Sequence, residues 1–298
     1  MRKYPPSAFV AVAVVLGVVI FGLIPGQIAA RIVLVTPAGV PRFTELQPVI
    51  QPIVMNVSMF SMMLLGIWIW VRFVVGRPFR GLGWEREDVV RHVARGMALA
   101  MVMAAAACGL SIVQGFSSSS GLVQRFGSAA FGIRFISLLS YCVQGPAEET
   151  LFRGWLMRAL SARYRPWVGV IGSAVVFSLA HSLNGGIGLL GYLSLFLFGS
   201  CAALLALREG GLWEAGAWHG VWNWMMGDVL GFTLDGLPHV GLFRAIHGTG
   251  SDFITGGAFG PDGGIGCIAV LLAAIAVLCA RLAFRRDRPA NFSHAGFV

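Results

Sequence analysis

The sequence is poor in charged residues, and lysine is nearly absent from it. Only 12% of the 298 residues are charged, whereas a typical soluble domain carries about 25%. Lys3 is the single lysine among 22 basic residues. The hydrophobic fraction reaches 57%, and the mean hydropathy is +0.78. This composition excludes an ordinary soluble domain and predicts an integral membrane protein.

Several sequence motifs are also missing. The five cysteines lie in apolar segments without a CxxC pair, which argues against a disulfide framework or a cysteine metal site. There is no HExxH zinc-binding motif. The serines of residues 114–128 lie in a polar loop, and Asp228 follows "MMG" rather than the GxG of intramembrane aspartyl proteases. The glycine-rich "TGGAFGPDGG" lacks the lysine of a phosphate-binding loop, so its glycines are interpreted as turn residues.

Eight apolar segments have about the length that a bilayer-spanning helix requires, roughly 20 residues. The predicted fold class is therefore all-α, a polytopic membrane helix bundle of about eight transmembrane helices in a single membrane domain, 1–298. The first segment is longer than a signal-peptide core, which favours an uncleaved span. The predicted spans are 7–25, 52–75, 93–113, 131–160, 167–183, 187–207, 213–232 and 263–281.

The basic residues are distributed unequally between the two sides of this predicted topology. One side receives 16 of them and the other receives only Arg31, Arg42, Arg125 and Arg244. The positive-inside rule then places both termini in the cytoplasm, in a multi-pass protein of a membrane that we expect to be the bacterial inner membrane. Because the arginines are spread over separate loops, the sequence predicts no nucleic-acid partner.

Few ionisable residues lie inside the predicted spans, where charge is costly and commonly marks a functional site. Three of them have simple structural interpretations. Glu214 begins a helix, where an acid suits the dipole; Asp228 is expected to contribute to helix packing, and Arg134 to pair with an acid or face a cavity. The others are Glu148, Glu149, Arg153, His181 and His219.

The stretch "GPAEETLFRGW" contains two adjacent carboxylates and an arginine. Glu149 and Arg153 are four residues apart with the acid first, the spacing at which helical side chains meet best. Glu148 points about 100° away from Glu149 and has no partner in its own turn. The spacing therefore predicts one structural ion pair and one carboxylate that is free to act as a general base.

Two further polar pairs occur at helical spacing. Phe177 and His181 share one face of "FSLAH", and Glu148 and His181 both lie about 16 residues from the turn between their helices, so an antiparallel hairpin places them at one depth. His219 and Asn223 share one face of "HGVWN", where both can donate hydrogen bonds to an oxyanion. The alternative for "HGVWN" is a polar contact that holds helices together.

These three motifs, in this order, resemble EExxxR, FxxxH and HxxxN of the CAAX protease and bacteriocin-processing (CPBP, Abi) family of intramembrane endopeptidases. The resemblance covers 131–265, where "TGGAFGPDGG" is also similar to a segment of bacterial members. It implies a catalytic core at 131–265, accessory spans in 1–113, a basic cytoplasmic tail at 282–298 and an active site in a polar cavity within the bilayer.

The resemblance also implies roles for individual residues. Glu148, assisted by His181, would activate water to hydrolyse a peptide bond of a membrane-associated protein or peptide. His219 and Asn223 would stabilise the oxyanion, while Glu149, Arg153 and Phe177 would support the site.

Three alternatives remain open at this stage. A zinc ion could be bound by Glu148, His181 and His219, although a mechanism without a cofactor also explains Asn223 and is favoured. The chain could be a non-catalytic membrane scaffold or a bacteriocin-immunity protein on the same fold. An ion-coupled transporter is less favoured, because no inverted repeat of broken helices is apparent.

Overall fold

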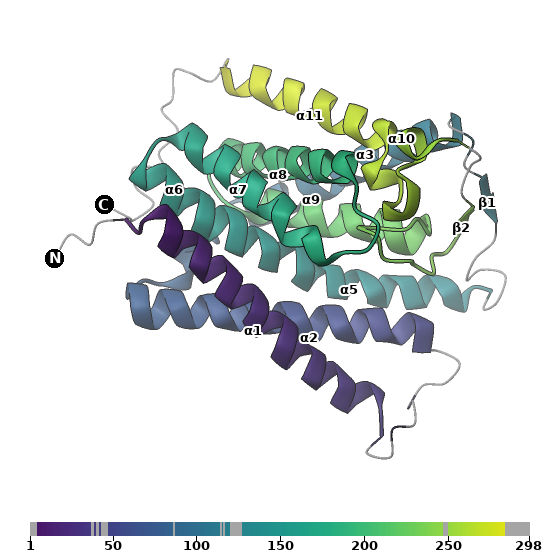
Figure 1. Ribbon diagram of the computed structural model, residues 1–298, viewed down its shortest axis with the longest axis horizontal. Coiled ribbons are helices and arrows are strands. Elements are labelled where there is room, and N and C mark those ends of the chain that lie inside the picture. The colour runs from purple at the N-terminus through teal and green to yellow at the C-terminus, as the bar shows by residue number, and fades with distance from the viewer. Residues whose placement is uncertain are drawn as a thin grey trace.

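The computed structural model describes residues 5–283, except for 37–38, 40–41, 43–46, 86, 114, 116, 120–126 and 247–249. Most of the predicted tail 282–298 and the basic residues Arg2, Lys3, Arg86 and Arg125 lie outside the described residues. The chain forms a bundle of helices that run roughly alongside one another (Figure 1). The α-helices are α1 (Ala8–Leu34), α2 (Gln47–Ile69), α3 (Val89–Val113), α5 (Ala129–Glu149), α6 (Arg158–Arg163), α7 (Pro166–Ala180), α8 (Leu189–Glu209), α9 (Trp213–Asn223), α10 (Asp252–Thr255) and α11 (Ile265–Ala283).

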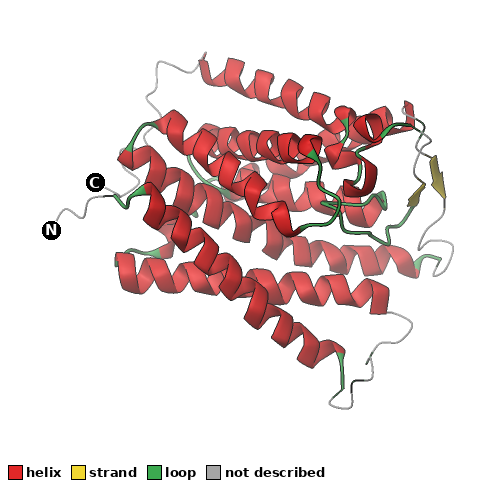
Figure 2. Cartoon of the chain, viewed as in Figure 1, coloured by secondary structure: helices red, strands yellow, loops and turns green. Residues whose placement is uncertain are grey.

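Helices dominate the described structure, as predicted, and one small antiparallel ribbon was not predicted (Figure 2). The ribbon pairs β1 (Ser117–Ser119) with β2 (Arg244–Ile246) in the register Ser117–Ile246. It joins two loops that the sequence predicts on the same side of the membrane. The 3-10 helices are η2 (Phe79–Leu82), η4 (His181–Leu183), η6 (Gly257–Phe259) and η7 (Pro261–Gly263).

Five helices are long and apolar enough to cross a membrane: α1, α2 with its extension to Val75, α3, α8 and α11. The shorter α7 is also apolar. The predicted spans 131–160 and 213–232 are helical too. Because they carry the ionisable motifs, their composition alone does not identify them as membrane-spanning helices. The helical membrane bundle is confirmed, and the number of eight spans stays a prediction.

The motif-bearing helices lie at the centre of the bundle. α9 packs against α5 on one side and α3 on another, while α7 packs against α8 and α11 covers α8. α1 packs against α2, which in turn contacts α5. The beginning of α1, the end of α11 and the α6–α7 turn lie at one end of the bundle, and the β1–β2 ribbon lies at the other (Figure 1). This arrangement agrees with an even number of crossings.

Both central helices widen into π-helix at their motifs, directly after Glu149 in the first and directly after Asn223 in the second. α5 continues as η3 (Thr150–Met157) and then α6, and α9 continues as η5 (Trp224–Val229). A third π segment, η1 (Trp70–Val75), ends α2. Pro146 precedes η3 and supplies no backbone N–H, and its carbonyl oxygen accepts a 2.6 Å hydrogen bond from the Thr150 hydroxyl. Short π segments are frequent at functional sites, because the wider turn redirects neighbouring side chains.

Candidate active site

The predicted ion pair between Glu149 and Arg153 is present and completely buried. Nη1 of Arg153 lies 2.8 Å from Oε1 of Glu149, and both side chains are 0% exposed. Nη2 of Arg153 donates a 2.9 Å hydrogen bond to the carbonyl oxygen of Gly199 in α8. The guanidinium also lies 4.6 Å from the ring centroid of Phe177 in α7, a cation–π contact. Arg153 therefore connects three helices around a neutralised charge.

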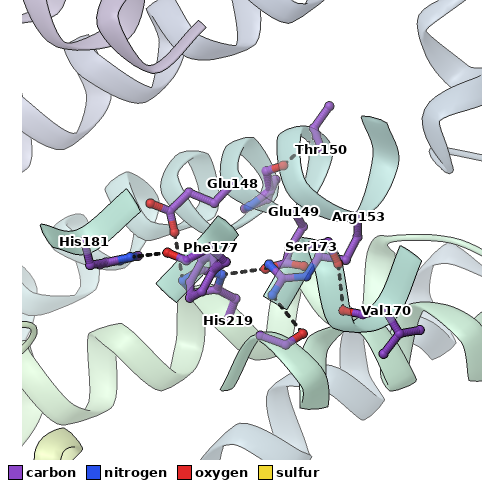
Figure 3. Close-up of polar contacts among 11 residues, drawn as sticks. Glu148, Glu149, Thr150, Arg153, Val170, Ser173, Phe177, His181 and His219 are labelled. Atoms are coloured by element: carbon purple, nitrogen blue, oxygen red, sulfur yellow. Dashed lines mark hydrogen bonds and ion pairs between the residues drawn. The ribbon is translucent and has the colours of Figure 1, made fainter. Parts of the chain in front are cut away.

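His219 is held between the two adjacent carboxylates of the first motif. Its Nδ1 lies 2.8 Å from Oε1 of Glu149, and its Nε2 lies 3.2 Å from Oε2 of Glu148 (Figure 3). A carboxylate that is paired with arginine can only accept hydrogen bonds, so Nδ1 of His219 is the donor to Glu149. Glu149 thus fixes the ring orientation, and Nε2 is the nitrogen that faces Glu148.

His181 occupies the end of its helix, beside the same cluster. Its Nδ1 lies 2.9 Å from the carbonyl oxygen of Phe177, and the ring centroids of Phe177 and His181 are 4.8 Å apart. Figure 3 shows the His181 side chain on the same side of the cluster as Glu148. The direct contact of Glu148 is with His219, and the pairing of Glu148 with His181 that the hairpin argument gave stays a prediction.

Close packing of α5 on α9 explains why that contact is possible. A side chain at Gly145 would place a Cβ 2.6 Å from the backbone nitrogen of Gly220, and one at Gly220 would place it 2.5 Å from the carbonyl oxygen of Tyr141. Only glycine permits this approach. Glu148 follows Gly145 by three residues and His219 precedes Gly220, so the backbone approach brings their side chains together.

Asn223 and His219 line a cavity of about 20 Å³, which has room for about one water molecule. Ser194 of α8 and the rings of Phe177, Phe198 and Trp222 contribute to the same lining. Glu148 and His181 do not line this cavity, but Glu148 contacts His219, which does. Two acids from the loop after α9, Asp235 and Asp262, complete the polar part of the lining.

The remaining ionisable residues of the predicted spans have structural partners. Nη1 of Arg134 lies 2.7 Å from Oδ2 of Asp228, and both side chains are buried. His239 lies 3.1 Å from the other oxygen of Asp228. Glu214 pairs with Arg208. The structural interpretations of Arg134, Asp228 and Glu214 are therefore confirmed.

The proposed zinc ligands do not form a compact donor set. Within the described residues, the ligand atoms of Glu148, His181 and His219 do not all lie within 4.8 Å of one another. The group that meets this criterion is His92, Glu209 and Glu214, at the start of α9. Both of its carboxylates already have partners, because Glu214 pairs with Arg208 and Glu209 accepts the backbone N–H groups of Trp213 and Glu214. The metal-free mechanism and its zinc alternative stay predictions that a chelation experiment must decide.

Sequence reasoning missed Asp235 and Asp262 because their loop was interpreted only as turns and surface packing. One signal was available in the sequence. Asp262 lies between Pro261 and two glycines, immediately before an apolar span. Burying a charged side chain at such a position costs free energy, so an acid there commonly has a function.

Comparison with known proteins identifies one family. The chain matches the model described as Type II CAAX prenyl endopeptidase Rce1-like over residues 130–225. No curated protein and no solved structure matches the chain. The matched segment contains all three motifs and ends just after Asn223. Residues 130–225 are therefore similar to an Rce1-like endopeptidase domain, which confirms over this segment the CAAX protease family predicted from the motifs. The apolar helices around the segment are those of a membrane-embedded protein.

Proposed function

We propose that the protein cleaves a peptide bond of a membrane-associated protein or peptide by using a water molecule activated by Glu148. The observation that carries this proposal is the 3.2 Å contact between Oε2 of Glu148 and Nε2 of His219 at a buried site. A buried carboxylate beside an imidazole is the pairing that general base catalysis requires. A purely structural role has no need of it, because Arg153 already neutralises Glu149.

The proposed reaction divides the work between two groups of residues. Glu148, assisted by His181, takes a proton from water, and the resulting hydroxide attacks the peptide carbonyl carbon. In this step Glu148 and His219 separate: Glu148 contacts the water, and His219 contacts the developing oxyanion. His219 and the side-chain amide of Asn223 stabilise that oxyanion, the term that is commonly the largest in acyl transfer. Glu149 keeps the His219 ring in place throughout.

The decisive experiment compares the purified wild type with Glu148→Gln in proteoliposomes that contain internally quenched, lipid-anchored peptides. We expect Glu148→Gln to lose at least about 100-fold in cleavage rate, the size of a general-base contribution. Wild-type activity in the variant would refute the mechanism. If wild type and variant are both inactive on every peptide and in a proteomic comparison of whole cells, the scaffold or bacteriocin-immunity alternative is favoured.

A metal requirement is tested separately. We expect full cleavage activity after exhaustive chelation, because the Glu148–His219 pair and Asn223 supply the required groups without an ion. A loss of activity that zinc alone restores would contradict this expectation and favour Glu148, His181 and His219 as ligands in a rearranged site.

A further inference from the structure

A second pair of acids meets the cavity from the loop between α9 and α11. Asp262 is 7% exposed, and its Oδ2 is buried without a hydrogen bond among the described residues. Its other oxygen faces the thiol of Cys267, with a sulfur–oxygen distance of 3.7 Å. Asp235 is half-buried and lines the same cavity as Asp262. Burial of an unsatisfied carboxyl group is costly, so its position requires an explanation.

The loop is built to hold these two acids at the cavity. Asp235 has a φ of +52°, a left-handed conformation that is uncommon outside glycine. The next residue, Gly236, donates a 2.9 Å backbone hydrogen bond to the carbonyl oxygen of Phe259. Gly260 has a φ of +99° and lies so close to the backbone of Thr233 that no side chain fits there. These contacts join the two parts of the loop that carry Asp235 and Asp262.

Neither acid has a basic partner in the part of the chain that the structure describes. Two carboxyl groups that line one cavity without a counter-ion do not both ionise readily, which favours a retained proton on one of them. His219 lines the same cavity and contacts Glu148, so it connects the two acids to the proposed base. The proposed hydrolysis needs a proton donor for the departing amine, and a protonated acid beside His219 and Asn223 can supply that proton.

We propose that Asp262, positioned by Asp235, is the general acid that protonates the departing amine when the peptide bond breaks. The inference rests on the proposed function. It gives the acid and base roles to two different carboxyl groups, one that lines the cavity with the oxyanion donors and one that contacts His219. The alternative is that Glu148 performs both steps itself.

The proposed step balances as follows. Water supplies hydroxide to the carbonyl carbon, and Glu148 keeps the water's other proton. When the carbon–nitrogen bond breaks, its electron pair stays on nitrogen, and the proton of the Asp262 carboxyl group completes the amine. The oxyanion electrons restore the carbonyl of the new carboxylic acid. The proton held by Glu148 then returns to the Asp235–Asp262 pair, which resets the site.

The acid role predicts a specific pH dependence. Burial, and then the nearby charge of Asp235, raises the pKa of Asp262 above the usual range of a carboxyl group. The other titratable groups around it are Cys267 of α11 and His219 across the cavity. A general acid must be protonated, so amide cleavage falls as pH rises through this raised pKa. Asp262→Asn removes that alkaline decline.

The test uses two versions of one cleaved peptide, identified first from a mixture of quenched lipid-anchored peptides as one that wild-type proteoliposomes cleave and protein-free liposomes do not. One version has the natural amide and the other has a thioester at the same bond. A thiolate, with a pKa of about 8.5, leaves without protonation, whereas an amine does not. Asp262→Asn should slow the amide by about 100-fold or more and the thioester by only a few-fold. Asp252→Asn, at an exposed acid of the same loop, should change neither.

The ratio of the two rates is independent of how much variant folds. An equal loss on amide and thioester, or no loss on either, would overturn the general-acid role of Asp262. If Glu148→Gln abolishes both reactions in that case, the proposed function survives without the inference. If Glu148→Gln leaves both reactions intact, the proposed function fails together with it.

Discussion

Glu148 and Glu149 are neighbours in sequence, but their surroundings give them different tasks. Glu149 lies between Arg153 and His219, within 2.8 Å of a nitrogen of each, and is completely buried. Glu148 contacts the far nitrogen of His219 and retains 9% exposure. In the proposed mechanism, Glu149 therefore holds the site together and Glu148 is the carboxylate that reacts.

Substitution should separate these two tasks. Glu149→Gln leaves the buried Arg153 without its counter-charge, and breaking a buried ion pair in this way costs about 3–5 kcal/mol. Glu148→Gln removes no ion pair with arginine, so its stability should remain close to wild type while its activity is lost. Thermal unfolding in detergent, followed by intrinsic tryptophan fluorescence, measures the difference. Equal unfolding temperatures for the two variants would contradict the division.

The local and the long-range parts of the site differ in how well the sequence predicts them. The Glu149–Arg153 pair follows from a spacing of four residues, because one helix turn fixes both positions. The contact of Glu148 with His219 depends on which helices are neighbours, and this is set by the glycine approach of α5 to α9. Asp262 could not be placed because its loop has no regular period from which a face can be read.

At the scale of the elements, α5 and α9 form the interface on which the site depends. Gly145, Gly216 and Gly220 let the two backbones approach closely, a device common in membrane helix pairs. The imidazole contacts are formed across this interface, and the ion pair lies beside it. Any change that separates the two helices by even a small distance should therefore affect chemistry as well as stability.

Gly145→Ala tests this dependence. Its Cβ would lie 2.6 Å from the backbone nitrogen of Gly220, so α5 and α9 must separate, and we expect lower thermal stability together with a large loss of cleavage. Gly132→Ala in the same helix is the matched control, because no neighbouring atom lies within 4 Å of the place that its Cβ would occupy. That substitution should be neutral or stabilise the protein by about 0.4–1 kcal/mol. Similar behaviour of the two variants would show that the close approach is unimportant.

At the scale of the whole molecule, the sequence predicts the helical membrane class well, because 57% hydrophobic residues leave few alternatives. It predicts the helix ends less well. α1 continues to Leu34, through Pro25, beyond the predicted end at residue 25. The motif helices widen into π segments. Hydropathy cannot predict them, because it depends on composition and a π-helix is defined by its hydrogen-bond pattern.

The orientation of the molecule can be tested by reporter fusions. Sixteen of the twenty basic residues that are assigned to a side of the membrane fall on the side predicted to be cytoplasmic, so a fluorescent protein fused after Ala283 should fluoresce in a bacterial host. Alkaline phosphatase inserted in the loop of 114–128 should be active, because that loop is expected outside. The reverse pattern would show that the predicted topology is inverted.

The separation of the partners of Glu149 along the chain has a consequence for synthesis. Arg153 is four residues away in the same helix, so the buried charges can neutralise each other as soon as that helix forms. His219 is 70 residues away and is translated much later. The nascent chain thus carries Glu148, the proposed general base, through most of its synthesis without the imidazole that contacts it. A truncated product that ends before α9 is therefore expected to be an inert membrane protein.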